Sequence, residues 1–281
     1  RYDFPYDQYV DETLNGSASG GMSLRIVTVA SVLYGSGDQN LIMKSQVNNE
    51  VIVVLSDETP YFDELEQAMK IRKYVKQRNV SHLPESIQRI IRERNEEARK
   101  LEDHARSQIE KAIVDGKFYV HGEVLNLKSG SAKDKIDAAM KSLVESVYSK
   151  LNMVNQFADT DADVFSIFNS PQDEITFTGL GANNEDALND ISQWLELRSQ
   201  KMLKTSMGDV QDRYQKIPYG WKEIDIAALI ARLIVQQKIQ INYGGAMVGK
   251  DDRRLVDYLR KKSEIYNAIV VRHIAPDETL I

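Results

Sequence analysis

Residues 84–115 read PESIQRIIRERNEEARKLEDHARSQIEKAIVD, with no glycine and no proline after the first position. The apolar residues recur every three or four positions, which places them on one narrow stripe of an α-helix: Ile87, Ile91, Ala98, Leu101, Ala105 and Ala112. A helix of this length spans ~45 Å. Because its stripe is thin and rich in alanine, the helix needs a second helix for stability, and we predict a protruding arm. A solvated helix without a binding role is the alternative.

A second amphipathic stretch, Ser131–Phe157, carries a wider apolar stripe and predicts a core helix that packs against the long helix. Between the two helices, the apolar runs of Lys117–Leu127 predict a β-hairpin. The two helices are therefore expected to lie antiparallel as a helical hairpin. The stripe of the second helix contains Ile136, Ala139, Met140, Leu143, Val144, Val147, Tyr148, Leu151 and Val154.

The N-terminal part of the chain predicts a small sheet followed by a helix. A Gly/Ser-rich run, Asn15–Gly21, is expected as a flexible loop. The helix is expected to begin at Asp57–Pro60 and to continue to about Gln77. Three apolar segments are expected as strands: Leu24–Leu33, Leu41–Gln46 and Glu50–Leu55.

The last third of the chain predicts helices and short strands in the order helix, turn, helix and β-hairpin, which is typical of a winged helix. The expected helices are Asn184–Lys204, Met207–Gln215, Glu223–Gln237 and Asp251–Lys262, and the expected strands are Ile239–Tyr243, Met247–Val248 and Ala268–Arg272. An acidic, loop-rich segment with one weak strand signal, Ile175–Thr178, precedes this region.

Together these patterns predict an α+β, mainly α chain with a small N-terminal β-sheet, a long antiparallel helical hairpin as an arm, and a C-terminal helical, winged-helix-like module. The expected parts are a sheet and helix at 1–78, the arm at 79–158, an acidic linker at 159–183 and a basic module at 184–281.

The composition excludes several kinds of chemistry. With no cysteine among 281 residues, the chain has no disulfide, thiolate metal site or cysteine nucleophile, which fits a reducing compartment, and the cytoplasm is the expected location. No apolar run reaches the ~18 residues that span a bilayer. The chain begins at Arg1 without a signal-peptide pattern, and Pro276–Ile281 read like the first turn of another element, so an excerpt from a longer protein is expected.

Charge is unevenly distributed along the chain. Residues 198–273 hold fifteen Lys or Arg and eight Asp or Glu, which is a net charge of +7. Since the whole chain has a net charge of −6, the remaining residues together carry −13. Basic residues of this region are candidates for phosphate contacts with nucleic acid if several share a face: Arg213, Lys216, Lys222, Arg232, Lys238, Lys250, Arg253, Arg254, Arg260, Lys261 and Lys262. In that hypothesis Glu223–Gln237 is the recognition helix and Tyr243–Val248 the wing. A solvated or protein-facing surface is the alternative.

Local motifs assign no catalytic, cofactor-binding or metal residue. The run Gly16–Gly21 lacks the lysine that follows in a phosphate loop. Asp159–Asp163 resembles the start of an EF-hand loop, but Val164 and Ser170 stand where glycine and the bidentate glutamate belong. The histidines are too scattered for a metal site: His82, His104, His121 and His273.

The turn Pro218–Trp221, PYGW, is expected to be structural. Proline and glycine favour a tight connection, and the two aromatic side chains can close it onto the following helix as a hydrophobic clasp.

Several blocks in the same order resemble one known family over roughly residues 40–272. They are KIRKYV at 70–75, PESIQRIIRERNEE at 84–97, KFYVHG at 117–122, LVESVYSKL at 143–151 and IPYGW at 217–221. They are similar to the region downstream of the ATPase core in the BrxC/PglY family, the large P-loop proteins of the BREX phage-defence system.

The resemblance implies that the parent protein is a cytoplasmic bacterial AAA+-like ATPase that uses ATP and Mg²⁺ and acts with other BREX proteins in marking host DNA and blocking phage DNA. The phosphate loop would lie before Arg1, so the chain itself is not expected to be an enzyme, and residues 1–55 would be the tail of the ATPase core. Two functions stay open. One is a noncatalytic segment that transmits nucleotide state to partner proteins or double-stranded DNA, with a homo-oligomer as a further candidate; the other is a stand-alone winged-helix DNA-binding module of a larger regulatory protein.

Overall fold

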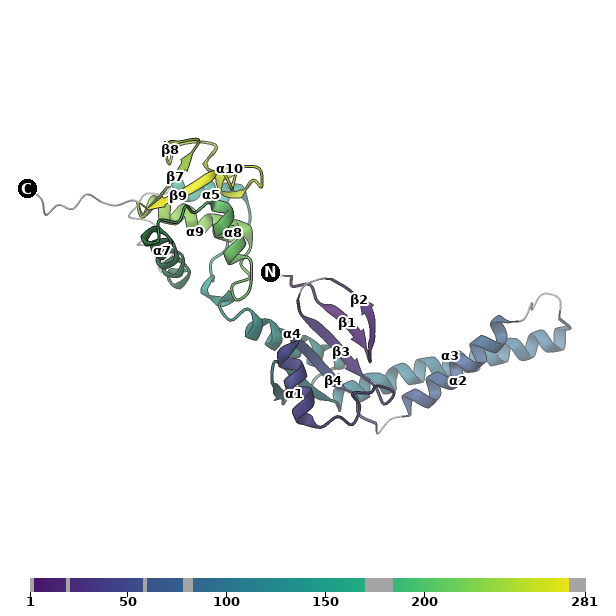
Figure 1. The fold of residues 1–281 in the computed structure, drawn as a ribbon. Coiled ribbons are helices and arrows are strands. Elements are labelled where there is room, and N and C mark those ends of the chain that lie inside the picture. The colour runs from purple at the N-terminus through teal and green to yellow at the C-terminus, as the bar shows by residue number, and fades with distance from the viewer. Residues whose placement is uncertain (1–2, 19–20, 58–59, 78–82, 170–183, 273–281) are drawn as a thin grey trace, which may run out of the picture. The chain divides into compact units, whose positions relative to one another are not determined.

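The computed structural model describes residues 3–18, 21–57, 60–77, 83–169 and 184–272. The chain divides into two compact units, Arg1–Ser146 and Val147–Ile281. The first unit contains a sheet and a long helical hairpin, and the second contains a helical domain with a small sheet (Figure 1). These elements confirm the predicted α+β, mainly α class.

A six-stranded sheet with the order β2-β1-β3-β4-β5-β6 forms the base of the first unit. β1, β3 and β4 run parallel to one another, whereas β2, β5 and β6 are antiparallel to their neighbours. Val51 and Val53 on one face of β4 and Ile52 on the other are fully buried. Both faces of this sheet are therefore covered. The strands are β1 (Asp7–Val10), β2 (Thr13–Gly16), β3 (Ser23–Val27), β4 (Glu50–Val54), β5 (Lys117–Val120) and β6 (Glu123–Leu125).

The predicted β-hairpin at 117–127 is confirmed as β5 and β6, but it does not merely join two helices. It extends the N-terminal sheet, with Phe118 opposite Val53. β1 and β2 were not predicted, because their sequences are polar and the turn between them places Asp11 at a positive φ of 52°. The flexible-loop prediction is wrong for Asn15 and Gly16, which belong to β2.

The segment predicted as a strand at Leu41–Gln46 is instead part of a helix, α1 (Asp38–Val47). Only Ile42 in that segment is β-branched, so its strand propensity is weak. Leu41 and Ser45, which are four residues apart, are buried, and α1 packs on β4 and β5. Leu41 joins Val27, Ile52 and Tyr119 in a core cluster between helix and sheet.

The long helix is confirmed as α3 (Glu85–Val114), but its partner is α2 (Tyr61–Lys76). Figure 1 shows the two helices side by side as a hairpin that extends from the sheet. Ala68 of α2 is fully buried, and small side chains let two helix backbones approach closely. The buried residues of α3 recur every seven positions: Ile91, Ala98, Ala105 and Ala112.

Two polar contacts fix the antiparallel register of this hairpin. The guanidinium of Arg72 donates to both carboxylate oxygens of Glu102, with nitrogen to oxygen distances of 2.9 and 2.8 Å. Nδ1 of His104 lies 2.8 Å from the carboxylate of Glu64. The hydrogen bond from Arg72 holds the pKa of Glu102 below its ordinary value.

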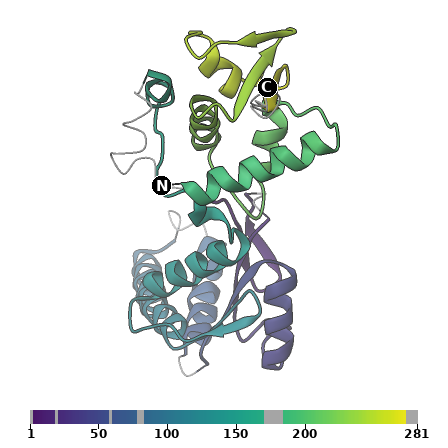
Figure 2. The same ribbon diagram turned by 90° about the vertical axis from the view of Figure 1, so that its left-hand side faces the viewer.

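The prediction that Ser131–Phe157 packs against the long helix is wrong. The helix in this segment, α4 (Ala132–Val147), ends at Val147 and a short 3-10 helix follows at Leu151–Met153. Figure 2 shows α4, in teal, and α1, in blue-violet, on opposite sides of the sheet. Ala139 and Leu143 of α4 are fully buried. The wide apolar stripe thus covers the second face of the sheet, which a thin helical arm cannot do.

The second unit is built around α9 (Glu223–Val235), which packs on α5, α7, α8 and α10. The order α8, turn, α9, β7, β8 confirms the predicted winged-helix order. β9 pairs with β7 as well, so the small sheet has the order β8-β7-β9. The wing, predicted at Tyr243–Val248, is taken here to continue through the loop at 249–254, and α10, which packs on α9, follows it. The other elements are α5 (Asp161–Asn169), α7 (Glu185–Gln200), α8 (Met207–Tyr214), α10 (Leu255–Arg260), β7 (Ile239–Tyr243), β8 (Ala246–Val248) and β9 (Ala268–Arg272).

The observed division of the chain differs from the four predicted parts. β5 and β6 complete the sheet begun by β1–β4, and α2 pairs with α3, so residues 1–78 and 79–146 form one unit. The acidic segment 159–183 is not a linker throughout, because α5 lies in it and buries Val164 and Phe168. The strand signal at Ile175–Thr178 lies outside the described residues.

Candidate interaction surfaces

The PYGW turn closes an aromatic cluster in the second unit. Trp221 stacks on Tyr214 with ring centroids 4.9 Å apart, and Tyr219 meets both rings edge-on at 4.6 and 5.0 Å. Trp221 is 1% exposed, and its indole Nε1 donates to the carbonyl of Lys150 at 3.1 Å. The two aromatic side chains of the turn are buried in the core, but their ring contacts are with Tyr214 of the preceding helix α8, and the indole bonds to Lys150, rather than closing the turn onto the following helix as predicted.

Asp190 of α7 lies beside this cluster and accepts three hydrogen bonds. The hydroxyls of Tyr219 and Tyr214 donate to Oδ1 at 2.8 and 3.1 Å, and Nζ of Lys150 lies 2.6 Å from Oδ2. Burial alone would raise the pKa of Asp190, but these three donors outweigh it and hold the pKa below the usual value. Sequence analysis missed Asp190. Its only signal was its position next to the apolar residues Ala187 and Ile191 of the same helix.

Replacing Asp190 by asparagine is expected to cost about 2 kcal/mol of unfolding free energy at pH 7, since hydrogen bonds to a charged group are lost. The folded-state pKa lies below the unfolded value of ~3.9, so this stability is present above that pH and disappears as pH falls through the folded value. Urea unfolding at neutral and acidic pH should therefore show the gap between wild type and D190N closing in acid. Asp186→Asn, an exposed position of the same helix, is the control with little change expected at either pH.

Four of the predicted nucleic-acid-binding residues are occupied by contacts within the second unit. Arg213 lies over the rings of Trp194, Tyr214 and Tyr219 at 5.1, 5.5 and 5.4 Å. Arg232 is half-buried and donates to the side chain of Gln156 at 3.2 Å, and burial lowers its pKa. Arg260 binds the carboxylates of Glu223 and Asp161, and Lys261 pairs with Asp257 at 2.7 Å.

The hypothesis that Glu223–Gln237 is a recognition helix does not agree with the structure. Every residue of α9 is buried or half-buried, and its buried side chains lie on all sides of the helix. A recognition helix must present several side chains to a DNA groove, which α9 cannot do in this fold. A helix whose apolar residues occupy all of its faces is typical of the centre of a core.

The remaining predicted cations are exposed, but they lie on separate elements. Lys250, Arg253 and Arg254 share the loop between β8 and α10, and Arg254 lies over the ring of Tyr258 at 5.0 Å. The others follow α8, precede α9, precede β7 and follow α10: Lys216, Lys222, Lys238 and Lys262. Of the eleven basic residues predicted to contact nucleic acid, three therefore lie together, in the wing.

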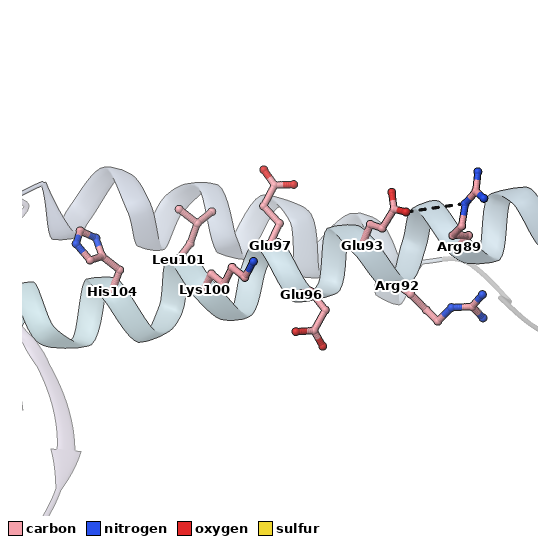
Figure 3. A pocket seen from close by; sticks show the side chains of 8 residues that line it. All are labelled: Arg89, Arg92, Glu93, Glu96, Glu97, Lys100, Leu101 and His104. Carbon is pink, nitrogen blue, oxygen red and sulfur yellow. Dashed lines mark ion pairs between the residues drawn. The ribbon is translucent and has the colours of Figure 1, made fainter.

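A shallow depression runs along α3 from Arg89 to His104 (Figure 3). Its lining holds charges of both signs, and Arg89 and Glu93 are paired at 3.9 Å. All eight lining side chains come from this one helix, so the described residues do not enclose a small-molecule site here.

A second cleft, of about 360 Å³, lies at the carboxyl end of β4. The hydroxyl of Tyr119 donates to Asp38 at 2.8 Å and holds the pKa of Asp38 below its usual value, with Lys117 at 3.4 Å. Asp57 and Asp115 also line the cleft. This excess of carboxylates in the cleft opposes the binding of a phosphate group there.

Two of the residues considered for metal binding, Asp163 and His104, have other partners. Asp163 caps the start of α5, accepting from the backbone N–H groups of Asp159 and Thr160 at 2.9 and 2.8 Å. His104 pairs with Glu64, while His82 and His273 lie outside the described residues. Within the described ranges, no three His, Asp or Glu side chains are placed to hold a metal ion. None of the helices in the described part of the chain is long and apolar enough to cross a bilayer.

The fold defines a class of protein: one unit in which a six-stranded sheet carries a helical hairpin, followed by a winged-helix unit. Two family models match it. The model described as BREX ATP-binding protein BrxC 4th domain with six-stranded beta sheet matches residues 1–143, and the BREX ATP-binding protein BrxC winged helix-turn-helix domain matches residues 150–274. The chain belongs to the BrxC family of BREX ATP-binding proteins, which confirms the resemblance. No solved structure matches the chain.

Proposed function

We propose that this chain is a noncatalytic interaction segment of a BrxC-type protein, which transmits the nucleotide state of an ATPase region elsewhere in the parent to other BREX proteins or to DNA. The observation that carries the proposal is the α2–α3 hairpin, which buries only its inner stripe and leaves its remaining surface to solvent. That surface includes large apolar side chains typical of binding surfaces: Phe62, Met69, Ile87 and Ile90 are 44%, 70%, 38% and 48% exposed.

The base of the hairpin is fixed to the sheet, which supports a role in transmission. The backbone N–H of Ser56, just after β4, donates to the carbonyl of Ala112 near the end of α3 at 3.1 Å. Gly116 follows α3, and a Cβ there would lie 2.6 Å from the carbonyl oxygen of Val54. Nζ of Lys135 in α4 donates to the carbonyl of Val114 at 2.7 Å. A displacement of the sheet would therefore be carried to the distal end of a rigid arm.

DNA contact by the winged-helix unit is a second candidate function. It is favoured by Lys250, Arg253 and Arg254, three exposed cations in one loop of the wing. Since α9 is enclosed, such contact would be made through the wing and would be independent of base sequence.

The test of the proposed function is association between purified components. The tagged 281-residue chain should retain at least one other purified BREX protein on a resin in the absence of added nucleotide. Failure to retain any of them at micromolar concentration would contradict an interaction role.

A further inference from the structure

Charge is segregated along the α2–α3 hairpin. Its distal end, defined here as residues 73–77 and 83–94, holds five cations and two carboxylates, a net charge of +3. The rest of the two helices, residues 61–72 and 95–114, holds six cations and eight carboxylates, a net charge of −2. The five distal cations are Lys73, Lys76, Arg89, Arg92 and Arg94.

Three of these cations are available for an external anion. Lys73, Lys76 and Arg92 are exposed, and no carboxylate of the described residues lies within ion-pairing distance of them. By contrast, Arg89 pairs with Glu93 at 3.9 Å and Arg94 with Glu97 at 2.5 Å.

We propose that the distal end of this hairpin binds the phosphate backbone of double-stranded DNA. The inference rests on the proposed function, in that it takes the hairpin as an interaction surface and names its partner. The helical residues 85–94 span ~15 Å, a length over which a DNA duplex carries about nine phosphates. At physiological salt the Debye length is ~8 Å, so the distal cations attract a polyanion as a group, whereas the carboxylates from Glu102 towards the base of the hairpin are largely screened from them.

The side chains at this end favour phosphate contact over base recognition. Lysine and arginine on solvated helix ends neutralise phosphates without reading sequence, and the amide of Gln77 and hydroxyl of Ser86 can donate further hydrogen bonds to phosphate oxygens. Because the chain as a whole carries −6, binding is expected to be confined to regions such as this one, where the local charge is reversed.

The test compares two triple variants of the 281-residue chain. One replaces the distal cations, Lys73→Gln, Lys76→Gln and Arg92→Gln. The control replaces the same residue types at exposed positions nearer the base of α3, Lys100→Gln, Arg106→Gln and Lys111→Gln. Affinity for a labelled duplex of about 20 base pairs is measured by fluorescence anisotropy between about 50 and 200 mM salt.

The distal variant is expected to bind at least tenfold more weakly, and its slope of log affinity against log salt should fall by about 3, since each lost phosphate contact removes about 0.9. The control should stay within about twofold of wild type. Lysine-to-arginine changes at 73 and 76 keep the charge, so they should retain binding if the effect is electrostatic rather than a loss of fold.

Several outcomes would overturn the proposal. Equal loss in both triple variants would show that position on the hairpin does not matter. Loss confined to a wing variant, Lys250→Gln, Arg253→Gln and Arg254→Gln, would place DNA on the second unit. If the distal variant lost binding to anionic vesicles or to a BREX protein but kept DNA affinity, the partner would be a membrane or an acidic protein. Loss of binding to a BREX protein alone would overturn the DNA proposal but would leave the proposed interaction function intact.

Discussion

Replacing Trp221 by alanine is expected to lower the free energy of unfolding of the second unit by about 3–5 kcal/mol, which is a large part of the stability of a typical domain. The indole ring is almost completely buried and stacks on Tyr214 with an interplanar angle of 7°. Its removal opens a cavity among aromatic rings that are held in place by Asp190, and it leaves the carbonyl of Lys150 without its Nε1 donor.

The control for this prediction is Trp194→Ala. Trp194 meets Tyr214 edge-on at 5.8 Å but is only half-buried, so the same substitution should cost clearly less. Urea unfolding gives the two free energies, and hydrogen exchange should rise within residues 184–272 while β3 and β4 keep their protection. Equal losses for both tryptophans would contradict the central place of Trp221 in this core.

The arm shows which part of a fold local sequence can predict. A long run without glycine or proline and with a repeating apolar stripe predicts α3 almost to its ends, because helix formation is a local property. The partner helix depends on tertiary packing. α2 packs on α3 through the small side chain of Ala68 and makes two polar contacts with it, from Arg72 and Glu64. The broader apolar stripe of Ser131–Phe157 favoured that segment as the partner of α3, but in the structure this stripe covers the sheet.

The candidate site shows a similar division. The clustering of Lys and Arg in the sequence predicted a nucleic-acid-binding surface on the second unit. In the structure, Arg232 and Arg260 bind Gln156 and Glu223 of the same unit, and these tertiary contacts cannot be predicted from the spacing of the basic residues. The enclosed position of α9 could have been predicted, because Ile226, Leu229 and Ile230 belong to an apolar surface that surrounds the helix. The unpaired cations Lys73, Lys76 and Arg92 at the distal end of the hairpin were overlooked, since their shared position appears only when α2 and α3 are paired.

A proline at Ala98 is expected to abolish the association of the chain with other BREX proteins. Ala98 is fully buried in the middle of the α2–α3 contact, and proline in a helix interior removes a backbone hydrogen bond and costs about 3 kcal/mol or more. The helix would break between its fixed base and its distal end, so that a displacement of the sheet would no longer reach the distal side chains. The winged-helix unit should keep its thermal unfolding and its aromatic circular dichroism.

The control carries the same change at a tolerant position. Ala132 is the first residue of α4, directly after Ser131, whose hydroxyl accepts from the backbone N–H of Asp134 at 3.2 Å. Proline is well tolerated at the first position of a helix, so Ala132→Pro should leave fold and association nearly unchanged.

The most direct test of an interaction role for the hairpin is therefore the recovery of a BREX protein by the two proline variants under identical conditions. The account predicts that the Ala132→Pro chain recovers its partner as wild type does, and that the Ala98→Pro chain recovers less than about a tenth as much, in line with a loss of at least 1.4 kcal/mol of binding free energy. Equal recovery by both variants, with a broken arm shown by hydrogen exchange in α3, would contradict it.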